Sequence, residues 1–214
     1  MNDTLQVAIV LFPHCTALDA VGPYEVLSRL PGASVQMVGE RTGPVRTDTG
    51  MLGLHVDATY AEVPTPDIVV VPGGFGQNAH RAGSALHEWL AEADRHSTWT
   101  TAACTGSVIL ASAGLLTGRR AATHWLAYDD LAAFGAVPTP ERVVFDGKYV
   151  TAAGVSAGID MALTLAARVA GEEMSQAIQL GIEYDPCPPY DAGRPAKAPR
   201  AAVELVSAVR ELIV

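Results

Sequence analysis

The chain has 214 residues, with 14 Lys and Arg against 23 Asp and Glu, which gives a formal net charge of −9. This acidic balance disfavours nucleic acids and anionic membranes as partners, because both require clustered basic charge. Hydrophobic residues make up 49% of the chain and charged residues 17%, a composition that excludes a disordered or fibrous protein. The length fits a single domain spanning residues 1–214.

The N-terminus and the cysteine usage bear on the compartment. The first residues carry no basic segment, and the apolar run Val7–Phe12 is far too short to span a membrane. Three cysteines without a CxxC pair favour a reducing compartment. We therefore expect a cytoplasmic protein without a membrane partner.

Apolar runs typical of buried strands alternate with helical patterns along the chain. The expected strands are Val7–Phe12, Ser34–Val38, Asp67–Val71, a run from Thr98 that ends at Cys104, Ala121–His124, and a hairpin of Arg142–Phe145 with Tyr149–Ala152. The alternation from Val45 to Tyr60 predicts a β-excursion. The expected helices are Val21–Leu30, Leu86–Arg95, one after Cys104 that Gly114 terminates, Tyr128–Phe134, Ser156–Ala170 with Ser156 as N-cap, Glu172–Ile182 and Ala201–Ile213.

This alternation predicts an α/β fold, a doubly wound and mostly parallel sheet with helices on both faces. Ligands bind such sheets beyond the carboxyl ends of the strands. Three features fall there: Asp19, the Gly73-Gly74 loop and Cys104. The proline-rich segment Pro186–Pro199 is interpreted as an ordered wrap or a dimer arm.

Cys104 lies where a β-prone run changes into a helical pattern, the position of a nucleophile elbow. Gly106 permits a close backbone approach there. A thiol at a helix N-terminus favours thiolate, so we expect a pKa of roughly 3.5–7.5. The alternative is a small buried hydrophobic residue. Cys15 and Cys187 are interpreted as structural or incidental.

The residues around this elbow predict its supporting groups. Backbone N–H groups of Gly73, Gly74 and Thr105 can stabilise a developing negative charge, although Pro-Gly-Gly can also be only a tight turn. Asp19 is either a cap of the next helix or a partly buried acid whose raised pKa suits proton exchange. The sequence leaves these two roles open.

Two further residues are candidates at the edge of the site. His124 follows a predicted strand and can pair with a thiol, but a histidine among aromatic and apolar residues is more often structural. Tyr184 follows a predicted helix and can close the crevice. The histidines show no ligand spacing, so we expect no metal.

Taken together, these stretches resemble the DJ-1/PfpI superfamily, and most of all its isonitrile hydratase branch. The similar segments are Leu18–Pro23, Val71–Gly74, Cys104–Ser107, Ala113–Trp125, Gly154–Asp160 and Ile182–Pro189. The resemblance implies a flavodoxin-like sheet, a homodimer, and a cysteine enzyme without a cofactor that acts on a small molecule.

By the same resemblance, Cys104 is the nucleophile, Asp19 is the acid facing it, and Gly74 and Thr105 lie beside the reacting centre. His124 and Tyr184 would stand behind these groups. The implied reaction is hydration of an isonitrile to an N-substituted formamide. Protease-like members follow their cysteine with histidine, whereas Thr105 stands here. Two alternatives are a ligand-sensing domain like those of AraC-type regulators, and a glyoxalase-like or deglycating enzyme.

Overall fold

The computed structural model describes residues 4–80 and 83–214, and a mixed sheet of seven strands runs through it. Its strands are β1 (Leu5–Val10), β2 (Ala33–Gly39), β5 (Ala58–Thr59), β6 (Ile68–Val71), β7 (Trp99–Ala103), β10 (Val143–Asp146) and β11 (Tyr149–Ala152). They lie in the order β10-β11-β7-β6-β1-β2-β5, and only β10 and β11 pair antiparallel. The central order β2-β1-β6-β7-β11 is the flavodoxin-like order, which confirms the predicted fold class.

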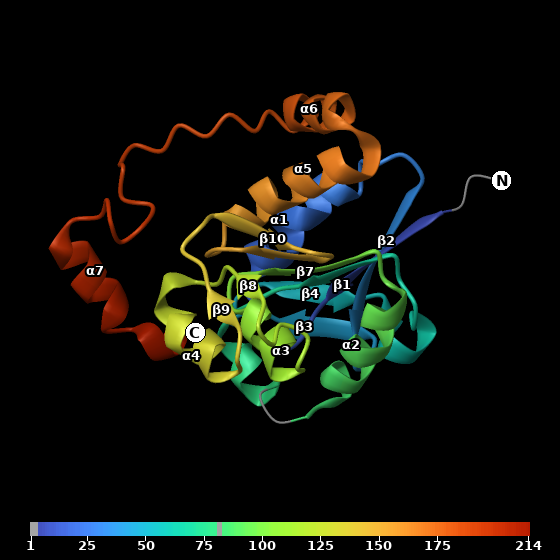
Figure 1. The fold of residues 1–214 in the computed structure, drawn as a ribbon, viewed down its shortest axis with the longest axis horizontal. Helices are drawn as coiled ribbons and strands as arrows, with labels where there is room; N and C mark the ends of the chain where they lie inside the picture. Colours follow the sequence, from blue (N-terminus) through green and yellow to red (C-terminus); the bar gives the residue numbers. More distant parts are fainter. Residues whose placement is uncertain (1–3, 81–82) are drawn as a thin grey trace.

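Helices cover both faces of this sheet (Figure 1). On one face lie α1 (Ala17–Leu27) and α5 (Ala157–Ala170), with α6 (Glu172–Gly181) packed on α5; on the other lie α2 (Ala85–His96), α3 (Gly106–Ser112) and α4 (Tyr128–Ala133). Short 3₁₀ turns are η1 (Tyr60–Glu62), η2 (Phe75–His80), η3 (Trp125–Ala127) and η4 (Arg210–Leu212). Two small sheets pair β3 (Gly43–Arg46) with β4 (Gly53–Val56), and β8 (Arg120–Ala121) with β9 (Val137–Pro138).

The central strands are buried on both faces, which explains why their sequences are uninterrupted apolar runs. All four residues of β6 are fully buried, as are residues 7–10 of β1. Parallel pairing of β1 with β2 on one side and β6 on the other aligns their carboxyl ends. The loops that follow β1, β6 and β7 therefore meet at one edge of the sheet.

The first helix begins earlier than the sequence predicts. We expected Val21–Leu30 after a loop ending at Asp19, but α1 starts at Ala17 and contains Asp19 in its first turn. The Asp19 N–H bonds the Thr16 carbonyl at 3.1 Å, and no side chain caps this helix N-terminus. The capping role considered for Asp19 is therefore wrong, because Asp19 belongs to the first helical turn and its carboxylate accepts the Gly73 N–H instead.

Other element boundaries also differ. The strand expected over Ala121–His124 ends at Ala121, because the Ala122 N–H donates to the Thr151 hydroxyl at 2.8 Å instead of to a strand. Ser156 stands at the N-cap of α5, but its side chain makes no capping bond. The single helix expected over Ala201–Ile213 divides into α7 (Arg200–Ser207) and η4.

The C-terminal segment leaves the body of the molecule after α6. Residues 183–199, here called the C-terminal arm, are extended and mostly exposed, and α7 buries no residue (Figure 1). The chain returns at η4, where Arg210 pairs with Asp130 at 2.6 Å, and ends at the buried Val214. Within the described ranges, no helix has the length and apolarity needed to cross a membrane.

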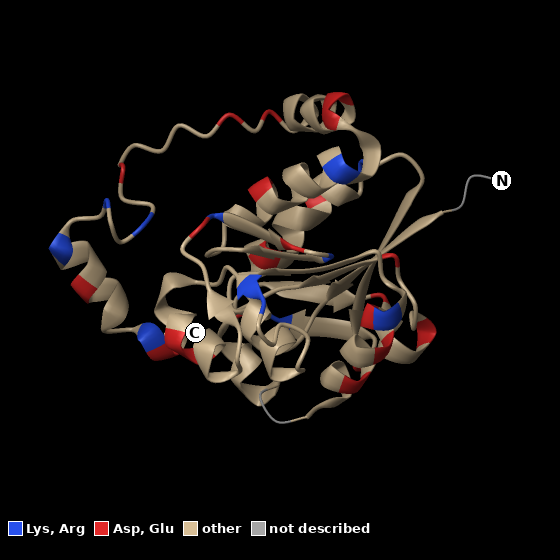
Figure 2. Cartoon of the chain, in the orientation of Figure 1, with Lys and Arg blue, Asp and Glu red and all other residues tan. Residues whose placement is uncertain are grey.

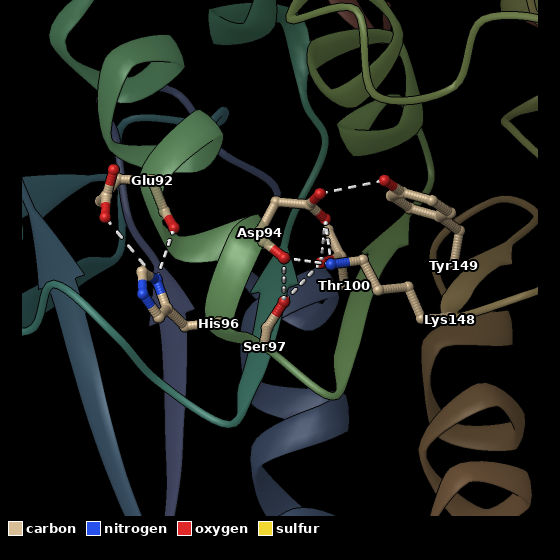
Figure 3. Close-up of polar contacts among 7 residues, drawn as sticks. All are labelled: Glu92, Asp94, His96, Ser97, Thr100, Lys148 and Tyr149. Carbon is tan, nitrogen blue, oxygen red and sulfur yellow. Dashed lines mark hydrogen bonds and ion pairs between the residues drawn. The ribbon is translucent and has the colours of Figure 1, made fainter.

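A polar cluster ties α2 to the amino ends of β7 and β11, at the opposite end of β7 from Cys104 (Figure 3). Asp94 accepts hydrogen bonds from Thr100 at 2.6 Å and from the Tyr149 hydroxyl at 3.0 Å. It also pairs with Lys148 at 3.1 Å, and its side chain is only 13% exposed. One carboxylate therefore satisfies three polar groups where a helix meets two strands.

Replacing Asp94 by alanine should lower the free energy of unfolding by roughly 2–3 kcal/mol, because three partly buried donors lose their acceptor. Chemical denaturation measures the change. Glu92 is the matched control on the same helix, since its ion pairs with Arg95 and His96 are exposed. Glu92→Ala should change stability by less than about 0.5 kcal/mol. Equal losses in the two variants would contradict the role given to the buried cluster.

Candidate active site

The first turn of α1, the loop after β6 and the elbow after β7 bring together Asp19, Gly73, Gly74, Cys104 and Thr105. The Gly73 N–H donates to Asp19 Oδ2 at 2.9 Å, and the Gly74 N–H donates to Thr105 Oγ1 at 3.0 Å. A Cβ atom on Gly73 would collide with the Thr105 backbone and contact Cys104 Cβ. Glycine is therefore required where the β6 loop crosses the elbow.

Cys104 has the strained backbone of a nucleophile elbow. Its φ is +55°, a left-handed conformation that non-glycine residues seldom adopt. Its N–H donates to the carbonyls of Ala152 and Ala153 at 3.2 and 3.1 Å, and its carbonyl accepts from the hydroxyls of Ser107 and Thr123. These bonds hold the strained residue in place. A Cβ atom on Gly106, the first residue of α3, would collide with the carbonyl oxygens of Val71 and Pro72, so the close backbone approach expected there does require glycine.

The thiol itself differs from the sequence expectation. We expected a lowered pKa, but burial raises the pKa of Cys104 well above its usual value, and the negative charge of Asp19 raises it further. Bonds from the backbone N–H groups of Val155 and Thr105 oppose this rise but do not outweigh it. The N-terminus of α3 lowers the thiol pKa less than desolvation raises it, because Cys104 is only 1% exposed. Burial and the Asp19 carboxylate therefore both favour the neutral thiol of Cys104 over its thiolate.

Asp19 is fully buried beside this thiol. Burial raises the pKa of Asp19 to about 7, although hydrogen bonds to Gly73 and Cys104 favour its charged form. Its Oδ1 has no hydrogen-bond partner among the described residues, whereas Oδ2 is held by Gly73. An acid with a pKa near neutrality can give or take a proton, which matches the second role considered from the sequence.

The two glycine amides do not serve as the free donors that we expected. The Gly73 N–H is used by Asp19 and the Gly74 N–H by the Thr105 hydroxyl, so neither is available to a developing negative charge. Gly74 has φ of +114°, and a Cβ there would collide with the His14 carbonyl and the Thr16 amide. Their observed role is to orient Asp19 and Thr105. Of the three amides that we expected to act as donors, the Thr105 N–H is the one that bonds the Cys104 sulfur.

His124 lies near the elbow but makes no hydrogen bond to the thiol in the structure's described part. Burial lowers the pKa of His124 to about 4, so its ring is neutral at pH 7. Its Nδ1 accepts the Leu126 N–H at 3.3 Å, which starts η3. Its ring packs on Gly154, where a Cβ would clash. His124 therefore shapes the pocket, and its neighbour Thr123 bonds the Cys104 carbonyl.

A cavity of about 500 Å³ is lined in part by His124, Trp125, Gly154 and Val155. Cys104 does not line this cavity, but the Val155 N–H bonds the Cys104 sulfur. Tyr184 was expected to close the crevice, but it does not line this cavity. Its hydroxyl bonds Asp160 of α5 and Arg142, and burial raises its pKa. Trp125 of η3 and the later part of the C-terminal arm, from Asp191 to Lys197, line the cavity instead.

The two other cysteines lie in surroundings that differ from those of Cys104. Cys15 is fully buried, and burial raises its pKa to about 11. Cys187 is exposed on the C-terminal arm. Among residues 4–80 and 83–214, no three His, Cys, Asp or Glu side chains gather as a metal site would require.

Val155 is the contact that sequence reasoning missed. Its backbone N–H bonds the Cys104 sulfur, and its φ of +24° shows that the loop after β11 bends sharply to deliver this amide. The available signal was topological, since β11 pairs with β7 and its carboxyl end must lie beside the elbow. The motif Gly154-Val155-Ser156 gave no chemical sign of this role.

Alkylation of Cys104 should follow the raised pKa. With iodoacetamide the rate should be low at pH 7 and keep rising above pH 9, because little thiolate exists below the thiol pKa. Asp19→Asn removes the carboxylate repulsion, so its profile should shift toward lower pH. Peptide mass spectrometry in a Cys187→Ser background measures the rates without the exposed thiol. A parent profile that levels off near pH 6 would contradict the neutral thiol.

A flavodoxin-like sheet with a cysteine elbow, faced by a buried acid from the first helix, defines a class of α/β proteins built around one thiol. The family model for the DJ-1/PfpI family matches residues 5–168. This chain belongs to the DJ-1/PfpI family, as the sequence resemblance indicated.

The chain is similar to an enzyme, to part of a transcriptional regulator and to a solved structure of the same family. Isonitrile hydratase of Pseudomonas putida is 42% identical over 94% of this chain and 87% of its own length. The HTH-type transcriptional regulator CdhR of Pseudomonas aeruginosa is 36% identical over 66% of this chain, which spans only 42% of that regulator. The crystal structure of a THiJ/PfpI family protein from Pseudomonas syringae superimposes with a TM-score of 0.91 at 35% identity, covering 98% of this chain and 88% of that one.

Proposed function

We propose that the protein is an isonitrile hydratase, adding water to R–N≡C to give R–NH–CHO. The observation that carries the proposal is the pairing of a buried acid of pKa about 7, Asp19, with the thiol of Cys104. The 42% identity with a protein named isonitrile hydratase over nearly the whole chain supports the choice of substrate.

In the first half-reaction, the Cys104 sulfur forms a bond to the terminal carbon of the isonitrile. Asp19 accepts the thiol proton as the sulfur attacks and delivers it to the same carbon. The product is a thioimidate, R–N=CH–S–Cys104. A resting thiol with a raised pKa suits this step, because the proton needed by the carbon is already stored in the site.

In the second half-reaction, a water molecule adds to the thioimidate carbon. Asp19 assists by taking a proton from the water, and the nitrogen gains a proton as the carbon becomes tetrahedral. The C–S bond then breaks, the formamide leaves, and the sulfur regains its proton. The N–H groups of Val155 and Thr105 stabilise the sulfur whenever it carries negative charge.

The test is a substrate panel on one purified sample. Aliphatic and aromatic isonitriles should be converted to the corresponding formamides, detected by mass spectrometry, while 2-oxoaldehydes should not be consumed beyond the uncatalysed rate. Turnover of 2-oxoaldehydes alone would favour the glyoxalase-like alternative. Isonitrile or other ligand binding without any turnover would favour a sensing role, for which the similarity to a transcriptional regulator is the argument.

We also propose that the protein is a homodimer with a two-fold axis, the commonest arrangement among soluble oligomers. Exposed apolar side chains such as Met51, at 82% exposure, and Leu180, at 80%, give such an interface material to bury. Light scattering coupled to size-exclusion chromatography should give twice the chain mass of 22.3 kDa. A mass of one chain at micromolar concentration would reject the dimer.

A further inference from the structure

The C-terminal arm forms part of the wall of the cavity next to Cys104. One part of that wall is Gly154 and Val155, and the Val155 N–H bonds the Cys104 sulfur. Another part belongs to the arm, which contributes Asp191, Gly193, Arg194, Pro195 and Lys197. A molecule that fills the cavity therefore has the nucleophile behind one wall and the arm along another.

The charged groups around this cavity are unequally paired. Five line it: Glu141, Arg142, Asp191, Arg194 and Lys197. Four of them are in ion pairs. Lys197 and Asp191 pair with each other at 2.6 Å, whereas Glu141 pairs with Arg120 at 2.5 Å and Arg142 pairs with Asp160, both partners lying outside the lining. Across residues 4–80 and 83–214, no carboxylate pairs with Arg194. The cavity therefore has one uncompensated positive charge.

The arm holds this arginine in a defined place. The N–H groups of Lys197 and Ala198 both donate to the Arg194 carbonyl at 3.0 Å, which forms a turn, and Pro195 restricts the backbone within it. Figure 2 shows Lys and Arg positions, in blue, on the part of the C-terminal arm where the chain bends before α7. An arginine presents a planar fork of donors that matches a carboxylate, so its position favours an anionic group in the cavity.

We propose that Arg194 binds a carboxylate of the substrate, so that the enzyme prefers isonitriles with an anionic group at the end remote from the –N≡C carbon. The inference rests on the proposed hydration for its reaction and on the cavity for its selectivity. In this orientation the isonitrile end faces Val155, whose N–H bonds the Cys104 sulfur, while the carboxylate meets the C-terminal arm. The whole chain has a formal net charge of −9, whereas three basic and two acidic side chains line this cavity.

Two rigid substrates of the same size test the proposal: 4-isocyanobenzoate and 4-isocyanobenzamide. The parent enzyme should show a kcat/KM about five- to tenfold higher for the carboxylate, the size expected of a charge-assisted hydrogen bond at a partly open site. Arg194→Gln should remove this preference mainly through KM, and Arg194→Lys should restore part of it. The amide should be hydrated at nearly the parent rate by both variants.

Arg200→Gln is the matched control, since Arg200 lies in α7, pairs with Glu204 and is outside the cavity. It should leave both substrates unchanged. Equal loss on the two substrates in Arg194→Gln, or a parent enzyme without preference for the carboxylate, would overturn the proposal.

A binding measurement separates this inference from the proposed reaction. Calorimetry on Cys104→Ala with 4-formamidobenzoate and 4-formamidobenzamide needs no turnover. Tighter binding of the carboxylate that disappears in the Cys104→Ala, Arg194→Gln protein supports Arg194 even if no isonitrile is hydrated. Failure of hydration with both isonitriles rejects only the reaction, whereas equal binding of the two formamides rejects the role of Arg194.

Discussion

Cys104→Ala should abolish isonitrile hydration, lowering kcat/KM by roughly 10⁴-fold or more, because no other group can form the thioimidate. The fold should persist, since alanine occupies less space than cysteine and the elbow is held by backbone bonds to Ala152 and Ala153. Steady-state assays measure the loss, and circular dichroism with thermal unfolding checks the fold.

Cys104→Ser should be nearly as inactive, because an alkoxide does not form beside an acid whose pKa is about 7. Cys187→Ser is the matched control: the residue is exposed on the C-terminal arm, so its loss should leave turnover unchanged. If Cys104→Ala retains parent turnover while Cys187→Ser is impaired, the elbow cysteine is not the nucleophile.

Asp19→Asn should lower turnover by about 10²- to 10⁴-fold, the range of general acid–base contributions, because the side chain keeps its shape but loses the exchangeable proton. The Asn carbonyl can still accept the Gly73 N–H, so the loop geometry should survive. Asp19→Glu should be more active than Asp19→Asn because it retains a carboxyl group. Asp57→Asn, at an exposed acid, is the control and should be neutral. Parent-level turnover in both Asp19 variants would reject the mechanism.

Stability gives a second readout at Asp19. The folded state raises the pKa of this carboxyl from 3.8 to about 7, so between these values it binds the proton more tightly than the unfolded chain does. Its contribution to stability is present in full below about pH 4 and is lost as the pH rises toward 7. Asp19→Asn should remove this part of the pH dependence, measured by urea unfolding from pH 4 to 8.

Several elements could be predicted because their signals are local. The apolar run Val7–Phe12 predicts a buried strand in a chain with this alternation, and β1 (Leu5–Val10) covers its first four residues. Gly114 ends the helix after Cys104 with φ of +82°, which the sequence also indicated. The start of α1 could not be predicted, because Thr16 opens the helix through its backbone carbonyl while Gly22 and Pro23 pack against α5.

The fold class, the family and the strand-to-helix turn at Cys104 are predictable from the sequence, because strand periodicity, glycine placement and the elbow pattern involve neighbouring residues. The protonation chemistry of that turn depends on contacts between distant residues. The pKa of Cys104 rises because burial and the Asp19 carboxylate act across elements that are 85 residues apart in sequence. Desolvation and charge depend on what surrounds a group in space, and that environment exists only after β1, β6, β7 and β11 have aligned their carboxyl ends.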